Sequence, residues 1–268
     1  MSEPFPAIDR RAARRNFERA APGYAGASRL ESEVGARMLE RLDYVKLAPR
    51  RVLDAGSGPP QRRLARRYPR AQVIALDFAL PMLRAGKSGF FRKKPPAICA
   101  DFEHIPLADG SLDLVWSNMA LHWASEPLAV FREFARVLAP EGLLMFSTLG
   151  PDTLKELRTV AGSAHVHAFL DMHDLGDMLV AAGFAAPVMD MELVTLRYTG
   201  AAQLVADLRA SGQANARRDR ARGLSGKRWR AQMLAGPAQA SYEVVYGHAW
   251  RGAPRDDAKK IRIFKRLP

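Results

Sequence analysis

Residues 51–58 read Arg51-Val-Leu-Asp-Ala-Gly-Ser-Gly58, and this stretch says most about the architecture of the chain. A short apolar run that ends in an acid and passes into a glycine turn is typical of a buried strand that leads into a helix. The glycines let the backbone approach a ligand that a Cβ atom would push away. The stretch therefore predicts the first strand–turn–helix unit of an open sheet, with a ligand beside the turn.

Outward from this stretch, apolar and helical segments alternate along the chain. Residues 61–68, 80–85 and 128–138 have the spacing of helices, and Pro140 and Gly142 should end the last of them. Strands are expected at residues 51–54, 72–77, 97–100, 112–117, 143–148, 188–198 and 242–250. Strands joined by crossover helices form a parallel sheet. We therefore predict an α/β fold with a doubly wound, mostly parallel seven-stranded sheet, a helical cap and a ligand crevice beyond the carboxyl ends of the strands.

The chain divides into four expected segments. Residues 1–45 carry apolar positions at helical spacing among charged ones and should form an N-terminal helical lid. Residues 46–150 hold the strand–helix alternation and the glycine turn, and should form the ligand-binding α/β core. Residues 151–250 should form the C-terminal half of the sheet, with a basic helical insertion near residues 201–235. Residues 251–268 are expected to be a basic, loosely held tail.

The composition is that of a folded protein with an unusual charge. Of the 268 residues, 48% are hydrophobic and 26% are charged, which excludes wholesale disorder. The net charge of +13 indicates an acidic partner, which could be nucleic acid, an anionic membrane or an acidic protein. The one cysteine, Cys99, excludes an intrachain disulfide and favours a reducing compartment. Because the chain also has no apolar run long enough to span a bilayer and no signal-peptide core, a cytoplasmic location is expected.

The residues around the glycine turn indicate a nucleoside site. Asp77 ends the second expected strand, where an acid can accept hydrogen bonds from both hydroxyls of a ribose. A dinucleotide site would need a third glycine, but Pro59-Pro60-Gln61 follows Gly58 instead. Asp54 would also repel a pyrophosphate, whereas it suits the cationic ammonium group of a methionine moiety. These features favour S-adenosylmethionine as the cofactor.

Several further motifs resemble those of class I S-adenosylmethionine-dependent methyltransferases. They cover about residues 45–150 and include Ala75-Leu-Asp77, Ala100-Asp-Phe-Glu103 before Ile105-Pro106, and Leu112-Asp-Leu-Val-Trp-Ser117. The resemblance implies a Rossmann-like sheet that binds the cofactor beyond the glycine turn.

A narrower resemblance extends over nearly the whole chain. Phe17-Glu-Arg-Ala-Ala-Pro-Gly-Tyr24, Trp116-Ser-Asn-Met-Ala-Leu-His-Trp123 and Leu208-Arg-Ala-Ser-Gly212 are similar to the malonyl-acyl-carrier-protein O-methyltransferases of biotin synthesis. The resemblance implies methyl transfer to the free carboxylate of a malonyl thioester. The partner would be malonyl-acyl carrier protein or malonyl-coenzyme A.

Carried over position by position, the resemblance implies a set of cofactor-binding residues. They are Gly56, Ser57 and Gly58 for the methionine part, Asp77 for the ribose, Asp101 and Phe102 for the adenine, and Asn118 for the wall of the site. Asp54 is added for its charge, and Phe78 for its position beside Asp77. Tyr24, His122 and Trp123 are candidates for closing the site or orienting the substrate. No catalytic residue is expected, because a carboxylate with a pKa of about 4 is already ionised near neutral pH and needs no base.

The basic residues between the last two strands are candidates for docking an acidic carrier protein. They are Arg217, Arg218, Arg220, Arg222, Lys227 and Arg228. Methylation of RNA is the rival interpretation, since positive patches also bind phosphates, but no Asn-Pro-Pro-Tyr motif or interleaved aromatic residues support it. His165, His167 and His173 lack the spacing of metal ligands, so no metal site is expected.

One further resemblance leaves another function open. Gly150-Pro-Asp-Thr-Leu-Lys-Glu-Leu-Arg158 and Asp174-Leu-Gly176 are also similar to a methyltransferase-fold assembly factor of respiratory complex I, which is linked to arginine hydroxylation. Because that relative would share the fold, the chemistry of the crevice has to distinguish an enzyme that transfers methyl groups from an assembly factor.

Overall fold

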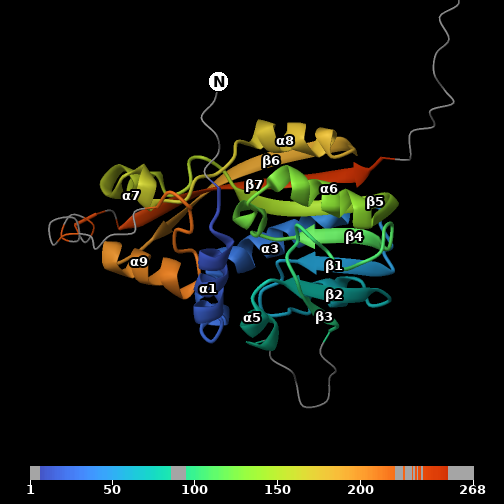
Figure 1. Cartoon of the computed structure of the whole chain (residues 1–268), viewed down its shortest axis with the longest axis horizontal. Helices are drawn as coiled ribbons and strands as arrows, with labels where there is room; N and C mark the ends of the chain where they lie inside the picture. Colours follow the sequence, from blue (N-terminus) through green and yellow to red (C-terminus); the bar gives the residue numbers. More distant parts are fainter. Residues whose placement is uncertain are drawn as a thin grey trace, which may run out of the picture.

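The structure is a computed structural model that describes residues 7–85, 95–220 and 238–252, together with residues 226, 231, 233, 235 and 236. Seven strands of these residues form one sheet in the order β3-β2-β1-β4-β5-β7-β6 (Figure 1). The strands are β1 Arg51–Ala55, β2 Gln72–Asp77, β3 Ala97–Cys99, β4 Leu112–Ser117, β5 Leu138–Leu149, β6 Phe184–Arg197 and β7 Gln239–Arg251. The expected strands all form.

The sheet is parallel except at one edge. β3, β2, β1, β4 and β5 pair in parallel, while β7 runs antiparallel to both β5 and β6. The strand order reverses between β1 and β4, which opens a crevice at the carboxyl ends of these two strands. The predicted doubly wound, mostly parallel fold is confirmed.

Helices cover both faces of the sheet and the end that carries the crevice. They are α1 Arg10–Ala20, α2 Tyr24–Ala27, α3 Arg29–Arg41, α4 Arg63–Arg67, α5 Leu80–Ala85, α6 Pro127–Val137, α7 Lys155–Ala161, α8 Met172–Ala181 and α9 Ala201–Ala210. In Figure 1, α1, α7 and α9 lie beyond the carboxyl ends of β1 and β4, and α1 contacts α9. No helix of the described residues is both long and apolar enough to cross a bilayer.

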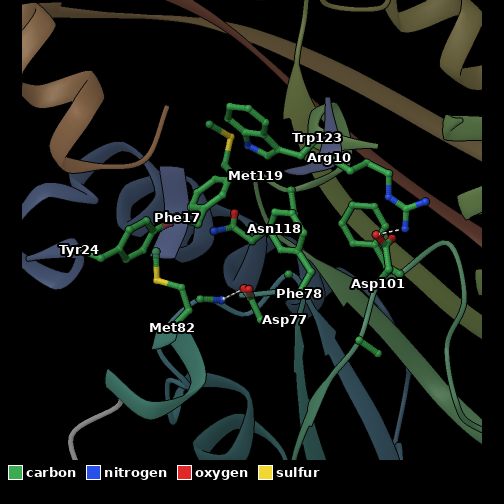
Figure 2. Close-up of a pocket in the computed structure, with 15 residues that line it drawn as sticks. Arg10, Phe17, Tyr24, Asp77, Phe78, Met82, Asp101, Asn118, Met119 and Trp123 are labelled. Atoms are coloured by element: carbon green, nitrogen blue, oxygen red, sulfur yellow. Dashed lines mark hydrogen bonds and ion pairs between the residues drawn. The ribbon is translucent and has the colours of Figure 1, made fainter. Parts of the chain in front are cut away.

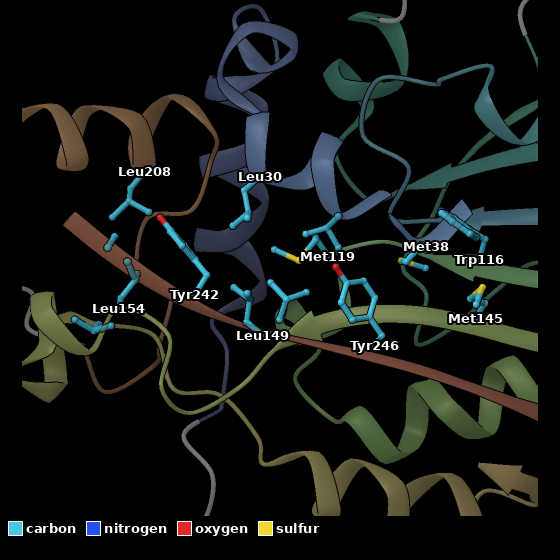
Figure 3. Packing of buried hydrophobic residues seen from close by; sticks show 14 of the residues in the cluster. Leu30, Met38, Trp116, Met119, Met145, Leu149, Leu154, Leu208, Tyr242 and Tyr246 are labelled. Atoms are coloured by element: carbon cyan, nitrogen blue, oxygen red, sulfur yellow. The ribbon is translucent and has the colours of Figure 1, made fainter. Parts of the chain in front are cut away.

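Alternation along the parallel strands produces a hydrophobic core on each face. Val52 of β1 packs with Val34 and Met38 of α3, while the next residue, Leu53, packs on the opposite face with Phe131 of α6. Successive strand side chains point to opposite faces, so strands covered on both faces become continuously apolar. Figure 3 shows the α3 face, where the packing extends from Trp116, Met145 and Met38 to Leu154, Leu208 and Tyr242 beside the crevice.

Of the helical insertion predicted near residues 201–235, the structure describes residues 201–220 and five of those that follow, and its first helix is α9. α9 ends at Ala210, and Gly212 adopts a left-handed backbone with φ of 76°. The amide of Gln213 then donates to the carbonyl of Leu208 at 2.7 Å, which is the pattern of a glycine helix stop. The chain continues in an extended form and pairs antiparallel with the N-terminal segment at Arg217 and Ile8.

The expected end of the helix at residues 128–138 is also shifted. α6 ends at Val137, and β5 already begins at Leu138, before Pro140 and Gly142. An irregularity in the pairing of β4 with β5 lies between Leu112 and Leu114, and Glu141 has a positive φ of 61°. A bulge of this kind accommodates extra residues, so the proline and glycine lie inside the start of the strand rather than in a loop.

Candidate active site

A cavity of about 610 Å³, part of it open to solvent, lies at the point where the strand order reverses. Figure 2 shows Asp77 and Phe78 at the end of β2, Asp101 after β3, and Asn118 and Met119 after β4. Tyr24, Phe17 and Arg10 close the cavity from the N-terminal helices. The crevice is therefore formed by strand ends and covered by residues from the start of the chain.

The glycine turn brings bare backbone to the wall of this cavity. Gly56 and Gly58 have φ values of 73° and 57°, in the left-handed region that favours glycine. A Cβ atom on Gly56 would lie 2.4 Å from the Cβ atom of Ala120, and one on Gly58 would lie 3.4 Å from the ring of Tyr24. The hydroxyl of Ser57 donates to the carbonyl of Gly58 at 3.0 Å. Larger residues at positions 56 and 58 would distort the turn or narrow the cavity.

Asp77 is a buried carboxylate that holds the turn in place. Its two oxygens accept hydrogen bonds from the amides of Gly58 at 2.9 Å and Ala79 at 2.8 Å. Burial raises the pKa of Asp77 to about 6, although both amide bonds oppose the shift. Each carboxylate oxygen can accept a second hydrogen bond, so the group can both shape the turn and bind a ligand hydroxyl.

Asp54 lies on the other side of the turn, in an adjoining cavity of about 560 Å³. Burial, and next the negative charge of Asp77, raise the pKa of Asp54 to about 7. Asn118 lines both cavities, and its amide donates to the carbonyl of Glu31 at 2.8 Å. Because Tyr24 also lines both cavities, they are two parts of one site with a buried acid in each part.

The end of the site beyond β3 is tied to the lid. Arg10 of α1 donates to the carboxylate of Asp101 and, at 2.9 Å, to that of Glu103. Phe102 packs edge-on against Phe134, with ring centroids 6.3 Å apart. Phe78 packs edge-on against Phe17 of α1 at 5.9 Å. Two predicted site residues, Phe78 after β2 and Asp101 after β3, therefore contact α1 directly.

His122 and Trp123 follow β4 in a short 3-10 turn, Leu121–Trp123. Trp123 lines the main cavity, where its ring is 5.1 Å from that of Phe17. His122 does not line that cavity but a second one, which Trp123 also lines. Burial, with a smaller effect of His167, lowers the pKa of His122 to about 3, so the ring is neutral near pH 7.

Comparisons with known proteins agree with this geometry. A family model described as a methyltransferase domain matches residues 53–146. A malonyl-[acyl-carrier protein] O-methyltransferase from Gallionella capsiferriformans is 50% identical over 96% of both chains, and one from Laribacter hongkongensis is 49% identical over 98% of both. The chain belongs to the malonyl-[acyl-carrier protein] O-methyltransferase family.

Solved structures support the fold at much lower sequence identity. The YcgJ protein of Bacillus subtilis has a TM-score of 0.59 at 18% identity, with 82% of this chain and 100% of that chain covered. The [4+2]-cyclase SpnF has a TM-score of 0.54 at 19% identity, with 81% of both chains covered. At 18% and 19% identity a shared fold does not imply a shared function. The likeness to these two proteins therefore establishes the fold alone.

Within this methyltransferase family, S-adenosylmethionine is the cofactor, and the site fits it. A Cβ atom on Gly56 would fill space beside the turn. Without it, a cofactor can approach the backbone closely. The two buried carboxylates, Asp54 and Asp77, suit a ligand that carries both a cation and hydroxyl groups. Among the described residues, no group of three or more His, Cys, Asp or Glu side chains could hold a metal ion.

Three of the predicted docking residues of this methyltransferase, Arg217, Arg218 and Arg220, do not line the cofactor cavity. Arg217 pairs with Asp219 at 2.5 Å and donates to the carbonyl of Ser163 at 2.9 Å. Arg220 pairs with Asp9 at 3.0 Å, and Arg218 donates to the carbonyl of Ile8 at 3.3 Å. These contacts give the three arginines an internal role, and their docking role stays a prediction. Arg222, Lys227 and Arg228 lie outside the described residues.

Sequence reasoning missed several residues of the site. Arg10 gave no signal, because it is one of many arginines at the start of the chain, and its partner Asp101 is distant in sequence. Arg63 gave no specific signal either, because it lies in a run of arginines, but it lines the cavity of Asp54 and donates to the carbonyl of Ser32 at 2.6 Å. His167 was considered only as a metal ligand, but it is a buried residue beside Trp123, with 5% of it exposed.

Proposed function

We propose that this protein transfers the methyl group of S-adenosylmethionine to the free carboxylate of malonyl-acyl carrier protein in the synthesis of a biotin precursor. The observation that carries the proposal is the near full-length similarity to relatives named for this activity. The cavity adds independent support, because it joins a glycine turn, two buried acids and a lid at the carboxyl ends of the strands.

We infer the following roles for the residues of the site toward the cofactor. Asp77 would bind the ribose hydroxyls while it holds the amide of Gly58. Asp54 would pair with the ammonium group of the methionine part. Arg63, which lines the same cavity, would pair with the carboxylate of that methionine part. Asp101 and Phe102 would bind the adenine, beneath Arg10.

The proposed reaction needs positioning rather than a catalytic base. When bound, the cofactor supplies a methyl group on a positively charged sulfur. The malonyl carboxylate, with an ordinary pKa of about 4, arrives already ionised. Tyr24, Phe17 and Trp123 would exclude water and align the carboxylate. Alignment of two reactants can lower the barrier by about 7–11 kcal/mol in well-oriented cases. The negative carboxylate and the positive sulfur lose their charges as they react, so a site without water favours the reaction.

His122 does not need to act as a base in this reaction. Its ring is neutral near pH 7 and lines the second cavity rather than the cofactor cavity. We therefore propose that it has a packing or orienting role. We place the protein in the cytoplasm, because Cys99 is an exposed free thiol, which suits a reducing compartment.

A labelling experiment tests this function directly. The protein is incubated with S-adenosylmethionine labelled in its methyl group, and malonyl-acyl carrier protein, malonyl-coenzyme A and bulk RNA are offered in parallel. We expect label on malonyl-acyl carrier protein as a base-labile methyl ester. Label on RNA alone would overturn the proposal, and cofactor binding without any transfer would favour an assembly or hydroxylation role.

A further inference from the structure

A second cavity of about 850 Å³, part of it open to solvent, lies beside the cofactor cavity. Its walls are mostly apolar: Leu154 and Leu157 at α7, Val205 and Leu208 on α9, and Tyr242 on β7. Figure 3 shows Leu154, Leu208 and Tyr242 on this side of the molecule. Apart from His122 and Trp123, the lining residues lie outside residues 53–146, which the methyltransferase-domain model matches.

Trp123 joins the two cavities. Its side chain lines both of them, and only 6% of the residue is exposed. In Figure 2 the indole lies above the cofactor cavity, next to Met119. A ligand that filled the second cavity would therefore end at the ring that borders the proposed methyl-transfer site.

Three buried polar atoms at this junction have no partner among the described residues: Nε2 of His122, Nε1 of Trp123 and Nδ1 of His167. His167 donates from Nε2 to the carbonyl of His122 at 2.8 Å, and since a carbonyl only accepts, the proton is on Nε2. Burial lowers the pKa of His167 to about 4, so near neutral pH its Nδ1 is a bare acceptor. The indole N–H of Trp123 is a donor only.

The unpartnered atoms of Trp123 and His167 are complementary to a particular chemical group. The ring centroids of Trp123 and His167 are 4.9 Å apart, so a ring with a buried donor lies next to a ring with a buried acceptor. A secondary amide offers the complementary acceptor and donor on neighbouring atoms. The arm that carries acyl thioesters on carrier proteins and on coenzyme A is a chain of apolar methylene groups and two secondary amides, with a phosphate at the far end.

The outer part of the cavity carries a positive charge. Arg209 on α9 is exposed, lines the cavity and forms no ion pair within the described part of the chain. Asn215 also lines the cavity, and its amide donates to the carbonyl of Ala164 at 2.9 Å. A guanidinium group at the mouth of an apolar cavity suits a phosphate.

We propose that this second cavity binds the phosphopantetheine arm of the malonyl thioester, with Trp123 and His167 holding an amide and Arg209 the phosphate. The proposal rests on the proposed function, because it takes its ligand from that substrate class. It assigns substrate recognition to α7, α9 and β7 and leaves cofactor binding to the glycine turn. Trp123 and His167 act here as positioning residues.

The first test fills the cavity. V205W places an indole on the wall of the second cavity, and A206W, on the exposed side of the same helix, is the matched control. We expect V205W to raise the KM for malonyl-acyl carrier protein about tenfold or more, with the Kd for S-adenosylmethionine in calorimetry and the Tm close to those of A206W. An unchanged KM in a folded V205W protein would overturn the proposal.

The second test separates the arm from the carrier protein. Malonyl-coenzyme A carries the same arm, whereas the ethyl thioester of malonic acid carries neither amides nor phosphate. We expect H167L to lower kcat/KM about tenfold for both arm-bearing substrates and less than about twofold for the ethyl thioester. H167N, which keeps an acceptor, should recover part of the loss. An equal loss on all three substrates, or a loss on the carrier protein alone, would overturn the assignment.

A binding measurement distinguishes a failure of this proposal from a failure of the proposed function. Carrier protein with the arm attached should bind the full-length protein more tightly than carrier protein without it, and V205W should remove the difference. If wild-type protein transfers no methyl group yet keeps this preference, the function is wrong and the arm site stands. If methyl transfer occurs without the preference, the arm site is wrong.

Discussion

At the scale of single residues, two buried carboxylates distinguish this site from an ordinary strand–turn–helix connection. Asp77 accepts hydrogen bonds from two backbone amides, and burial and then the negative charge of Asp77 raise the pKa of Asp54. Two neighbouring acids in a low-dielectric site are unfavourable when both are ionised, so a cation or hydroxyl groups from a ligand would stabilise their charged forms.

Removal of the Asp77 carboxylate should weaken cofactor binding. D77A loses the contact with the ribose and two hydrogen bonds to the turn, so we expect the Kd for S-adenosylmethionine to rise about 10–100-fold in calorimetry. D113A is the matched control, because Asp113 also accepts from two backbone amides, those of Arg50 and Arg51, at the opposite end of β1. Equal cofactor affinity in the two variants would contradict the ribose assignment.

Cofactor binding should depend on pH through Asp54. The pKa of this group in the free protein is about 7, and the ammonium group of the cofactor favours its ionised form, so binding should release protons between about pH 5 and 7. Affinity should therefore fall as the pH falls through this window. Calorimetry in buffers with different ionisation enthalpies measures the release, and D54N should reduce it to the smaller share of Asp77, whose pKa is raised to about 6. A full release in D54N would assign the proton to another group.

The same shift has a consequence for stability. Because the folded-state pKa of Asp54 lies above its usual value of 3.8, the native state binds a proton that the unfolded state lacks between about pH 4 and 7. The contribution of Asp54 to stability is therefore present in acid and is lost as the pH rises through 7. Relative to D54N, the cofactor-free protein should become less stable between pH 5 and pH 8 in chemical denaturation.

At the scale of secondary-structure elements, the site depends on the fit between the glycine turn and its neighbours. The turn after β1 is packed against Ala120 after β4, and α1 and α2 cover it with Phe17 and Tyr24. α1 is anchored at its N-terminal end, because Asp9 caps it by accepting from the amide of Ala12 at 3.0 Å and Arg10 donates to Asp101. The lid is thus held by polar contacts at its rim and by aromatic packing inside.

A methyl group on the turn should disrupt the site. In G56A, alanine would adopt a left-handed backbone at a cost of about 1–2 kcal/mol and would overlap Ala120. We expect a lower Tm and a loss of cofactor affinity of about tenfold or more. G26A in α2 is the control, since no atom lies within 4 Å of its new Cβ atom. G26A should keep its affinity and gain up to about 1 kcal/mol of stability.

At the scale of the whole molecule, charge and topology act together. The net charge of +13 favours encounter with an acidic carrier protein. Arg217 and Arg220, however, connect the segment after α9 to residues 163–166 and to Asp9 near the start of the chain. Reversing their charge would therefore break these internal contacts as well as alter the electrostatic field of the protein. The stability of such variants has to be measured together with their activity.

Steering by charge should be visible in the dependence on salt. Raising the salt concentration from about 50 to 300 mM shortens the screening length from about 14 to 6 Å, which weakens attraction between exposed charges. We expect the KM for malonyl-acyl carrier protein to rise several-fold, while the KM for the ethyl thioester changes little. A parallel rise for both substrates would show that salt acts on the enzyme itself rather than on docking.

Much of the fold and of the cofactor site follows from short stretches of sequence. Apolar runs covered on both faces, glycines with positive φ and acids at strand ends are local patterns, so β1, β2, Gly56 and Asp77 could be placed by reading along the chain. Their partners in the site are close in sequence or adjacent in strand order. A strand-order reversal then brings their carboxyl ends together without further information.

Long-range packing accounts for the remaining features. Arg10 meets Asp101, His167 meets the carbonyl of His122, and α9 stops at Gly212, where a Cβ atom would lie 2.7 Å from Phe17. Each contact joins residues from different parts of the chain, and no spacing within one segment encodes it. The second cavity depends in the same way on α7 and α9 packing against β7, so only the tertiary structure forms it.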